Sequence, residues 1–168
     1  MKTVALIGFG VEGRAAALHF LSGGDHVIAL DDKAIAQPRP EEFAGQDRFE
    51  WLGAEGASDI FSRADIVLRS PGIPPTHPVL LQALAAGHHV TTPTGYWITN
   101  FLSEHALTVT GTKGKSTTVS LAVSLLLSMG HEAVALGNIG LPPLDTETAA
   151  PRFPVLELSS YMLHDIPD

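Results

Sequence analysis

The stretch Ala106-Leu-Thr-Val-Thr-Gly-Thr-Lys-Gly-Lys-Ser-Thr-Thr118 shows how the second half of the chain folds. The short apolar run from Leu107 to Val109 is typical of a buried strand, and a turn with two glycines and two lysines follows it. From Thr117 to Met129, apolar residues recur at the spacing of one helix face, at positions 119, 122, 123, 126 and 127. The pattern therefore predicts a strand, a glycine-bearing turn and a helix that ends at Gly130.

A turn of this composition suits a phosphate group. Backbone N–H groups at the start of a helix point towards an anion, Lys115 adds a positive charge, and the Ser116 hydroxyl can bind Mg²⁺. The turn departs from the general P-loop pattern, which requires glycine where this chain has Val109. A surface turn without a ligand stays open as an alternative, but the flanking strand and helix favour a phosphate site.

A second glycine-rich turn lies near the N-terminus. The apolar run from Thr3 to Ile7 predicts a buried strand, and Gly8-Phe-Gly-Val-Glu-Gly13 separates it from a helix predicted over Arg14 to Ser22. The next predicted strand, His26 to Leu30, ends at Asp31. This spacing is the G-x-G-x-x-G fingerprint, in which glycines let a diphosphate approach and the acidic residue binds a ribose hydroxyl. NAD and a nucleotide sugar fit it equally well, and a turn without a ligand is the alternative.

The rest of the first half alternates between strands and helices. Strands are predicted at 47–52, 64–69 and 88–91, helices at 57–62 and 77–86, and an exposed loop over 32–48. This alternation predicts a parallel sheet with helices on both faces and ligands beyond the carboxyl ends of its strands. The glycine turn, Asp31 and Ser70-Pro-Gly72 all follow strands, so we expect them at one crevice. A carboxylate at Glu12 would repel a diphosphate there unless it turns to solvent or caps the helix.

The predicted domains divide the chain near residue 93. Residues 1–93 form one α/β domain, 94–105 a linker with a short helix at 96–102, and 106–168 part of a second α/β domain. After the lysine-bearing turn, strands are predicted only at 131–136 and 153–158, with a polar connection at 141–152. The second domain would then have about three strands, whereas typical sheets have about four to six. We therefore expect an open sheet edge and a chain that stops inside its second domain. The alternative is a single domain in which the last strands join the first sheet.

Composition limits the class of protein. The 168 residues are 45% hydrophobic and 17% charged, which is typical of a globular chain, and no apolar run is long enough to span a membrane. Because the net charge is −8, a general nucleic-acid surface is not expected. The sequence has no cysteine, and its eight histidines lack metal-binding spacing. With no secretory signal visible, a cytoplasmic setting is favoured.

Five segments, taken together and in order, resemble the Mur ligases of peptidoglycan synthesis, and most of all the members that add glutamate. They are Gly8–Gly13, Ser70–Gly72, Thr110–Ser116, Leu136-Gly-Asn-Ile-Gly140 and Leu156-Glu-Leu-Ser-Ser160. The resemblance implies a Rossmann-like parallel-sheet domain for UDP, followed by an incomplete P-loop-type α/β ATPase domain. It implies an ATP-dependent amide ligase that uses Mg²⁺, phosphorylates UDP-N-acetylmuramoyl-L-alanine to an acyl phosphate and joins it to glutamate. It also implies that the full-length enzyme is a monomer.

The resemblance assigns roles to residues by position. The UDP substrate would contact Val11, Glu12, Asp31, Lys33, Ser70, Gly72, Asn138 and Ser159, the last two at its muramoyl end. ATP would bind Gly111, Thr112, Lys113, Gly114, Lys115, Ser116 and Thr117. Lys115 and Glu157 would be catalytic, and Ser116 and Glu157 would hold Mg²⁺. For Glu157, a carboxylate turned to water on a strand face is the alternative.

Two other functions stay open. An NAD-dependent oxidoreductase would use the first glycine turn but leaves the lysine-bearing turn unexplained. A non-catalytic nucleotide-binding module would use both turns. The family's modified lysine and its C-terminal domain have no counterpart in these 168 residues, so we expect no ligase activity from this chain alone.

Overall fold

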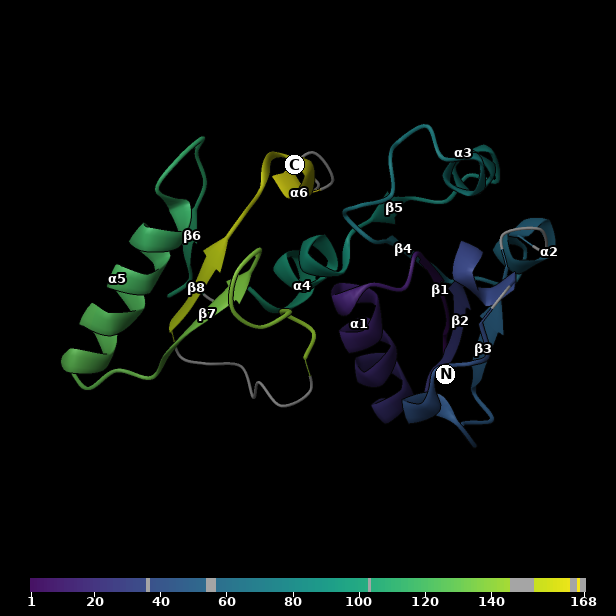
Figure 1. Ribbon diagram of the computed structural model, residues 1–168, viewed down its shortest axis with the longest axis horizontal. Coiled ribbons are helices and arrows are strands. Elements are labelled where there is room, and N and C mark those ends of the chain that lie inside the picture. Colours follow the sequence, from purple (N-terminus) through teal and green to yellow (C-terminus); the bar gives the residue numbers. More distant parts are fainter. Residues whose placement is uncertain (36, 54–56, 103, 146–152, 164–165, 167–168) are drawn as a thin grey trace. The chain divides into compact units, whose positions relative to one another are not determined.

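The computed structural model describes residues 1–35, 37–53, 57–102, 104–145, 153–163 and 166. The chain divides into two compact units, Met1–Pro93 and Thr94–Asp168, and each has its own parallel sheet (Figure 1). The strands of the second unit pair with one another and not with the first sheet. The alternative of a single shared sheet is therefore wrong.

Five parallel strands form the sheet of the first unit, in the order β3-β2-β1-β4-β5. They are β1 (Thr3–Ile7), β2 (His26–Leu30), β3 (Phe49–Leu52), β4 (Ile66–Arg69) and β5 (Val90–Thr91). The strand β1 lies at the centre and pairs with β2 on one side and β4 on the other. Because the strand order reverses at β1, its carboxyl end is where a Rossmann-like sheet binds its ligand.

Helices cover both faces of this sheet, as the sequence predicts. The helix α1 (Val11–Ser22) packs on β1 and β2, while α2 (Ala57–Phe61) and α3 (Pro78–Ala85) pack on each other on the opposite side (Figure 1). Alternate strand residues point to opposite faces. One set joins the core under α2 and α3, which holds Ala5, Ile7, Ile28, Leu30, Val67, Ile60, Phe61, Val79, Leu80 and Ala83.

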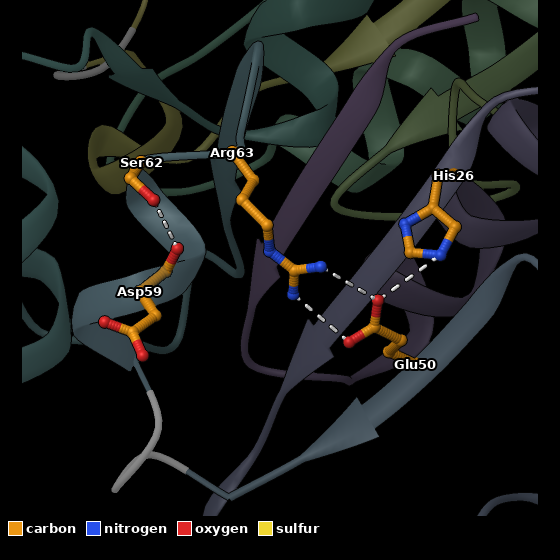
Figure 2. Close-up of polar contacts among 5 residues, drawn as sticks. All are labelled: His26, Glu50, Asp59, Ser62 and Arg63. Atoms are coloured by element: carbon orange, nitrogen blue, oxygen red, sulfur yellow. Dashed lines mark hydrogen bonds and ion pairs between the residues drawn. The ribbon is translucent and has the colours of Figure 1, made fainter.

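One carboxylate links β2, β3 and the end of α2 at the edge of the sheet. Glu50 accepts hydrogen bonds from both terminal nitrogens of Arg63, at 3.4 and 3.3 Å, and lies 3.3 Å from Nε2 of His26 (Figure 2). The Arg63 side chain is half exposed, and pairs of this kind contribute about 0–1 kcal/mol. The cluster therefore contributes little to the stability of the fold.

The segment between β2 and β3 is mostly exposed, as the sequence predicts, but it is not an irregular loop throughout. It contains two 3₁₀ turns, η1 (Asp32–Ile35) and η2 (Glu41–Phe43), and the side chain of Phe43 is fully buried. The Phe43 ring stacks on Phe49 with 4.3 Å between ring centroids. Phe43 is a single apolar residue among prolines and charged residues. Its burial therefore leaves no periodic apolar pattern in the sequence.

The second unit builds a smaller sheet of three parallel strands. Its elements are α4 (Pro93–Phe101), β6 (Leu107–Val109), α5 (Lys115–Ser128), β7 (Ala133–Gly137), β8 (Phe153–Glu157) and α6 (Ser160–Leu163). The order is β6-β8-β7, so the last strand lies in the middle, and Val155 and Leu156 are fully buried. The helix α5 packs against all three strands. The predicted polar connection at 141–152 lies partly outside the described residues, at 146–152.

Three helices begin earlier than predicted. The helix α1 begins at Val11 instead of Arg14, α4 at Pro93 instead of Tyr96, and α5 at Lys115 instead of Thr117. Both glycine turns therefore lead straight into a helix, and the third glycine of the first turn, Gly13, lies inside α1. Within the described part of the chain, no helix has both the length and the apolar character of a membrane span.

Candidate functional site

The first glycine turn closes tightly over the carboxyl end of β1. Gly8 has φ +84°, and a Cβ on it would lie 2.8 Å from Cγ1 of Ile73. A Cβ on Gly13 would lie 2.8 Å from the carbonyl oxygen of Gly8. Among the described residues nothing lies within 4 Å of the place where a Cβ on Gly10 would be. Gly8 therefore permits close packing of the Ile73 side chain and Gly13 close packing of the backbone, while Gly10 leaves the mouth of the turn open to a ligand.

Side chains from two other strand ends hold this turn. Asp31 accepts the N–H of Phe9 with Oδ2, at 2.8 Å, and the N–H of Lys33 with Oδ1, at 2.9 Å. The Ser70 hydroxyl donates to the carbonyl oxygen of Gly8 at 2.9 Å. The structure thus brings the glycine turn, Asp31 and Ser70 together at one end of the sheet. A ribose hydroxyl would share Asp31 with the turn itself, since each carboxylate oxygen has a second lone pair.

The other residues predicted to contact UDP surround this end of the sheet. Val11 and Glu12 occupy the first turn of α1, with Val11 exposed and Glu12 half-buried, and Gly72 is exposed after β4. A cleft of 580 Å³ opens beside the turn, and Asp31 and Lys33 line it.

Sequence reasoning missed the remaining lining of this cleft. Arg14 and Arg39 contribute basic side chains, and Phe9 and Trp51 contribute aromatic surface. Arg14 directly follows the third glycine in a chain with only 10 basic residues, which is a signal that could have indicated it. Arg39 and Trp51 give no comparable signal, because the fold of the segment between β2 and β3 brings them to the cleft.

The lysine-bearing turn of the second unit has two glycines with positive φ. Gly111 has φ +146° and Gly114 has φ +79°, so both adopt conformations that favour glycine. Lys115 folds back across the turn, and its Nζ donates to the carbonyl oxygen of Gly111 at 2.8 Å. The hydroxyl of Thr118 donates to the carbonyl oxygen of Gly114 at 2.9 Å. The other predicted ATP contacts, Thr112, Lys113, Ser116 and Thr117, are exposed.

A buried carboxylate lies beside the start of this turn. Glu157 ends β8 with 1% of its surface exposed, so the alternative of a strand carboxylate turned to water is wrong. It pairs in register with Val109, the residue before the turn, and the N–H of Leu158 donates to the carbonyl oxygen of Val109 at 2.9 Å. The lysine turn and the carboxylate therefore occupy neighbouring strand ends.

Only one of the two oxygens of this carboxylate has a hydrogen-bond partner among the described residues. Oε1 of Glu157 accepts a hydrogen bond from Nδ2 of Asn138 at 2.9 Å, whereas Oε2 is buried with no hydrogen-bond partner in the part of the chain that the structure describes. A buried, incompletely paired carboxylate is costly unless a cation binds it. Mg²⁺ prefers one or two carboxylates together with phosphate oxygens and water. Glu157 therefore fits the ion that the resemblance implies.

The segment Gly137-Asn-Ile-Gly140 presses onto the same strand end. Gly137 has φ +93°, and a Cβ on it would lie 2.5 Å from the carbonyl oxygen of Glu157. A Cβ on Gly140 would overlap the carbonyl oxygen of Ala135. The N–H of Asn138 donates to the carbonyl oxygen of Glu157 at 3.0 Å. Glycine at both ends of this turn is what lets Asn138 reach the carboxylate.

The two residues predicted to contact the muramoyl group belong to the second unit. Asn138 holds Glu157, as described above. Ser159 accepts the N–H of Met162 with its hydroxyl oxygen at 3.3 Å, and so caps the short helix α6. The six predicted UDP contacts Val11, Glu12, Asp31, Lys33, Ser70 and Gly72 all belong to the first unit.

Comparison with known proteins identifies relatives of the whole chain. UDP-N-acetylmuramoyl-L-alanine--L-glutamate ligase from Micromonospora sp. is 38% identical over 168 residues, which cover 99% of this chain and 36% of that protein. UDP-N-acetylmuramoylalanine--D-glutamate ligase from Mycolicibacterium vanbaalenii is 35% identical over 176 residues, which cover 98% of this chain and 34% of that protein. The chain thus spans about a third of the length of the curated relatives it matches.

A solved structure and a family model agree with these relatives. UDP-N-acetylmuramate:L-alanyl-gamma-D-glutamyl-meso-diaminopimelate ligase from Neisseria meningitides has a TM-score of 0.56 and 23% identity, covering 94% of this chain and 52% of that chain. At this identity the likeness concerns the fold alone. Residues 2–92 match the model of the Mur ligase MurD-like N-terminal domain. Because this match spans more than half of the sequence, the chain belongs to the MurD-like family of Mur ligases.

Proposed function

We propose that this chain carries the sugar-nucleotide site and the triphosphate loop of an ATP-dependent ligase that joins glutamate to UDP-N-acetylmuramoyl-L-alanine in the cytoplasm. Mur ligases are ATP-dependent amide ligases, and membership of this family supports the reaction class. Ligases for L-glutamate and for D-glutamate match at similar identity, so the proposal leaves the configuration of glutamate open. The observation that carries the proposal is the buried, half-paired Glu157 beside the lysine turn.

In this proposal the first unit binds the UDP part of the substrate. The turn from Gly8 to Gly13 offers backbone N–H groups to the diphosphate at the start of α1. The backbone N–H groups of Val11 and Glu12, in the first turn of α1, would contact the diphosphate, and Asp31 and Lys33 the nucleoside. Ser70 and Gly72 would complete the site, and Ser70 already holds the turn through Gly8. Asn138 and Ser159 remain the proposed contacts of the muramoyl end.

The second unit would hold ATP. Its turn from Gly111 to Thr117 would wrap the phosphates, and Lys115 would exchange the carbonyl oxygen of Gly111 for a phosphate oxygen. Glu157 and Ser116 would hold Mg²⁺, which when bound neutralises phosphate charge. An oxygen of the substrate carboxylate attacks the γ-phosphorus and ADP leaves; the glutamate amine then attacks the acyl carbon, loses a proton and expels phosphate. Lys115 would stabilise the charge that develops during phosphoryl transfer.

Magnesium-dependent nucleotide binding tests the role of Glu157. A non-hydrolysable ATP analogue should bind the wild-type chain more tightly with Mg²⁺ than without it, and Glu157→Gln should remove that difference. Glu132→Gln is the matched control, because Glu132 is exposed and lies at the opposite end of β7. Calorimetric titration measures all three proteins. A Glu157→Gln variant that keeps the full magnesium effect would contradict the proposed site.

A ligand comparison separates the ligase from an oxidoreductase. UDP-N-acetylmuramoyl-L-alanine should bind and be displaced by UDP, while NADH should show no saturable fluorescence change. Saturable NADH binding that UDP fails to displace would favour the oxidoreductase instead.

A further inference from the structure

The cleft beside the first glycine turn contains a basic residue that has no assigned role. We propose that Arg14 binds the diphosphate of the nucleotide, and that it does so by exchanging its partner Glu42 for phosphate oxygens. This inference rests on the proposed function, because it takes UDP as the ligand.

The cleft has the size and the charge that a nucleotide requires. Its volume of 580 Å³ falls within the range of small-molecule sites. Three basic side chains line it, from Arg14, Lys33 and Arg39, together with the carboxylates of Asp31 and Glu41. Both oxygens of Asp31 already accept backbone N–H groups. The lining thus gathers three of the 10 basic residues of a chain whose net charge is −8, next to two carboxylates.

Arg14 lies over the ring of one residue of the glycine turn. Its guanidinium carbon is 5.6 Å from the centre of the ring of Phe9, which is the second residue of the Gly8–Gly13 turn. Phe9 in turn packs against Phe43, Phe49 and Trp51, with ring centroids 5.5, 5.5 and 5.2 Å away. This aromatic cluster supports the guanidinium at a residue that belongs to the glycine turn.

The present partner of Arg14 can be replaced. Arg14 forms an ion pair with Glu42, and the two side chains are 47% and 43% exposed. A pair this exposed is weak, whereas a guanidinium binds phosphate with two parallel, charge-assisted hydrogen bonds. Glu42 would thus compete with the ligand for Arg14.

Two variants with opposite expected effects test this competition. Calorimetry would measure the binding of UDP and of uridine to each purified protein. Arg14→Gln should weaken UDP binding ~10-fold, because a charged hydrogen-bonding partner of phosphate is lost, and should leave uridine binding unchanged. Glu42→Gln should strengthen UDP binding ~3-fold, because the competing carboxylate is removed. Arg14→Lys keeps the positive charge but cannot form two parallel hydrogen bonds with phosphate. Its affinity for UDP should therefore lie between those of wild type and Arg14→Gln.

The controls separate a phosphate contact from a structural effect. Arg63→Gln removes an equally exposed arginine that pairs with Glu50 and does not line the cleft, and UDP binding should not change. Equal losses for UDP and uridine in Arg14→Gln, or unchanged UDP binding in it, would overturn the role of Arg14 while the proposed function stands. A wild-type chain that binds no UDP would refute the proposed function and this inference together.

Discussion

At the scale of single residues, backbone contacts decide where each turn needs glycine. The motif Gly137-Asn-Ile-Gly140 is readable in the sequence, but its reason is steric and becomes visible only in the structure. Its first glycine lies so close to Glu157 that even a methyl group would meet the carbonyl oxygen. Its conformation, with φ +93°, is also one that other residues rarely adopt.

We expect Gly137→Ala to destabilise the second unit by about 2–4 kcal/mol, from left-handed backbone strain together with steric overlap. Gly130→Ala is the control, since Gly130 has φ +81° but nothing described within 4 Å of an added Cβ. It should cost only about 1 kcal/mol. Denaturant unfolding measures both variants, and equal losses would show that the close contact with Glu157 contributes nothing.

A second prediction at this scale concerns His19 in α1. Burial lowers the pKa of His19 below its usual value of about 6.5, and the nearby carboxylate of Asp25 opposes this only in part. The folded chain therefore takes up a proton on His19 less readily than the unfolded chain. The stability that neutral His19 contributes is present above pH 6.5 and is lost as the pH falls towards the pKa of the folded state.

His19→Gln should therefore make the free energy of unfolding fall less steeply between about pH 7.5 and pH 5. Urea unfolding across this range measures the slope. His105→Gln, in an exposed position of the second unit, is the control. An unchanged slope in His19→Gln would show that the titration of His19 is not linked to folding.

At the scale of elements, periodic apolar patterns found nearly all strands and helices, but not the segment between β2 and β3. The strands β1 and β2 have the predicted bounds, because each is a continuous apolar run buried in the sheet centre. The segment after β2 has no such run. Its fold depends on Phe43, which reaches Phe49 and Phe9 across the chain. Glu42, the ion-pair partner of Arg14, lies in the same segment, so this ion pair could not be predicted from the sequence either.

We expect Phe43→Ala to cost about 3–4 kcal/mol of stability, because it removes a fully buried ring and leaves a cavity under the segment. Leu18→Ala, at a site of the same unit that is 42% exposed, should cost less than about 1 kcal/mol. Thermal unfolding compares the two. A small loss in Phe43→Ala would mean that the segment is held by other contacts.

At the scale of the whole molecule, the chain consists of two units that each place a glycine turn at the carboxyl end of a parallel sheet. The sequence predicts both turns and the Asp31 and Ser70 positions around the first, since all of them follow recognisable strands. It does not predict that Glu157 is buried, because a carboxylate at the end of an apolar strand fits a solvent-facing position equally well. Only the pairing of β8 with both neighbouring strands determines its burial.

The central claim is that the two turns bind different anions independently. Calorimetric titration of wild type and Lys115→Ala with UDP and with a magnesium complex of a non-hydrolysable ATP analogue tests it directly. Lys115→Ala should weaken binding of the ATP analogue about tenfold or more, because a charged phosphate ligand is removed, and should leave the affinity for UDP unchanged. Equal losses for both ligands, or no loss for the ATP analogue, would contradict it.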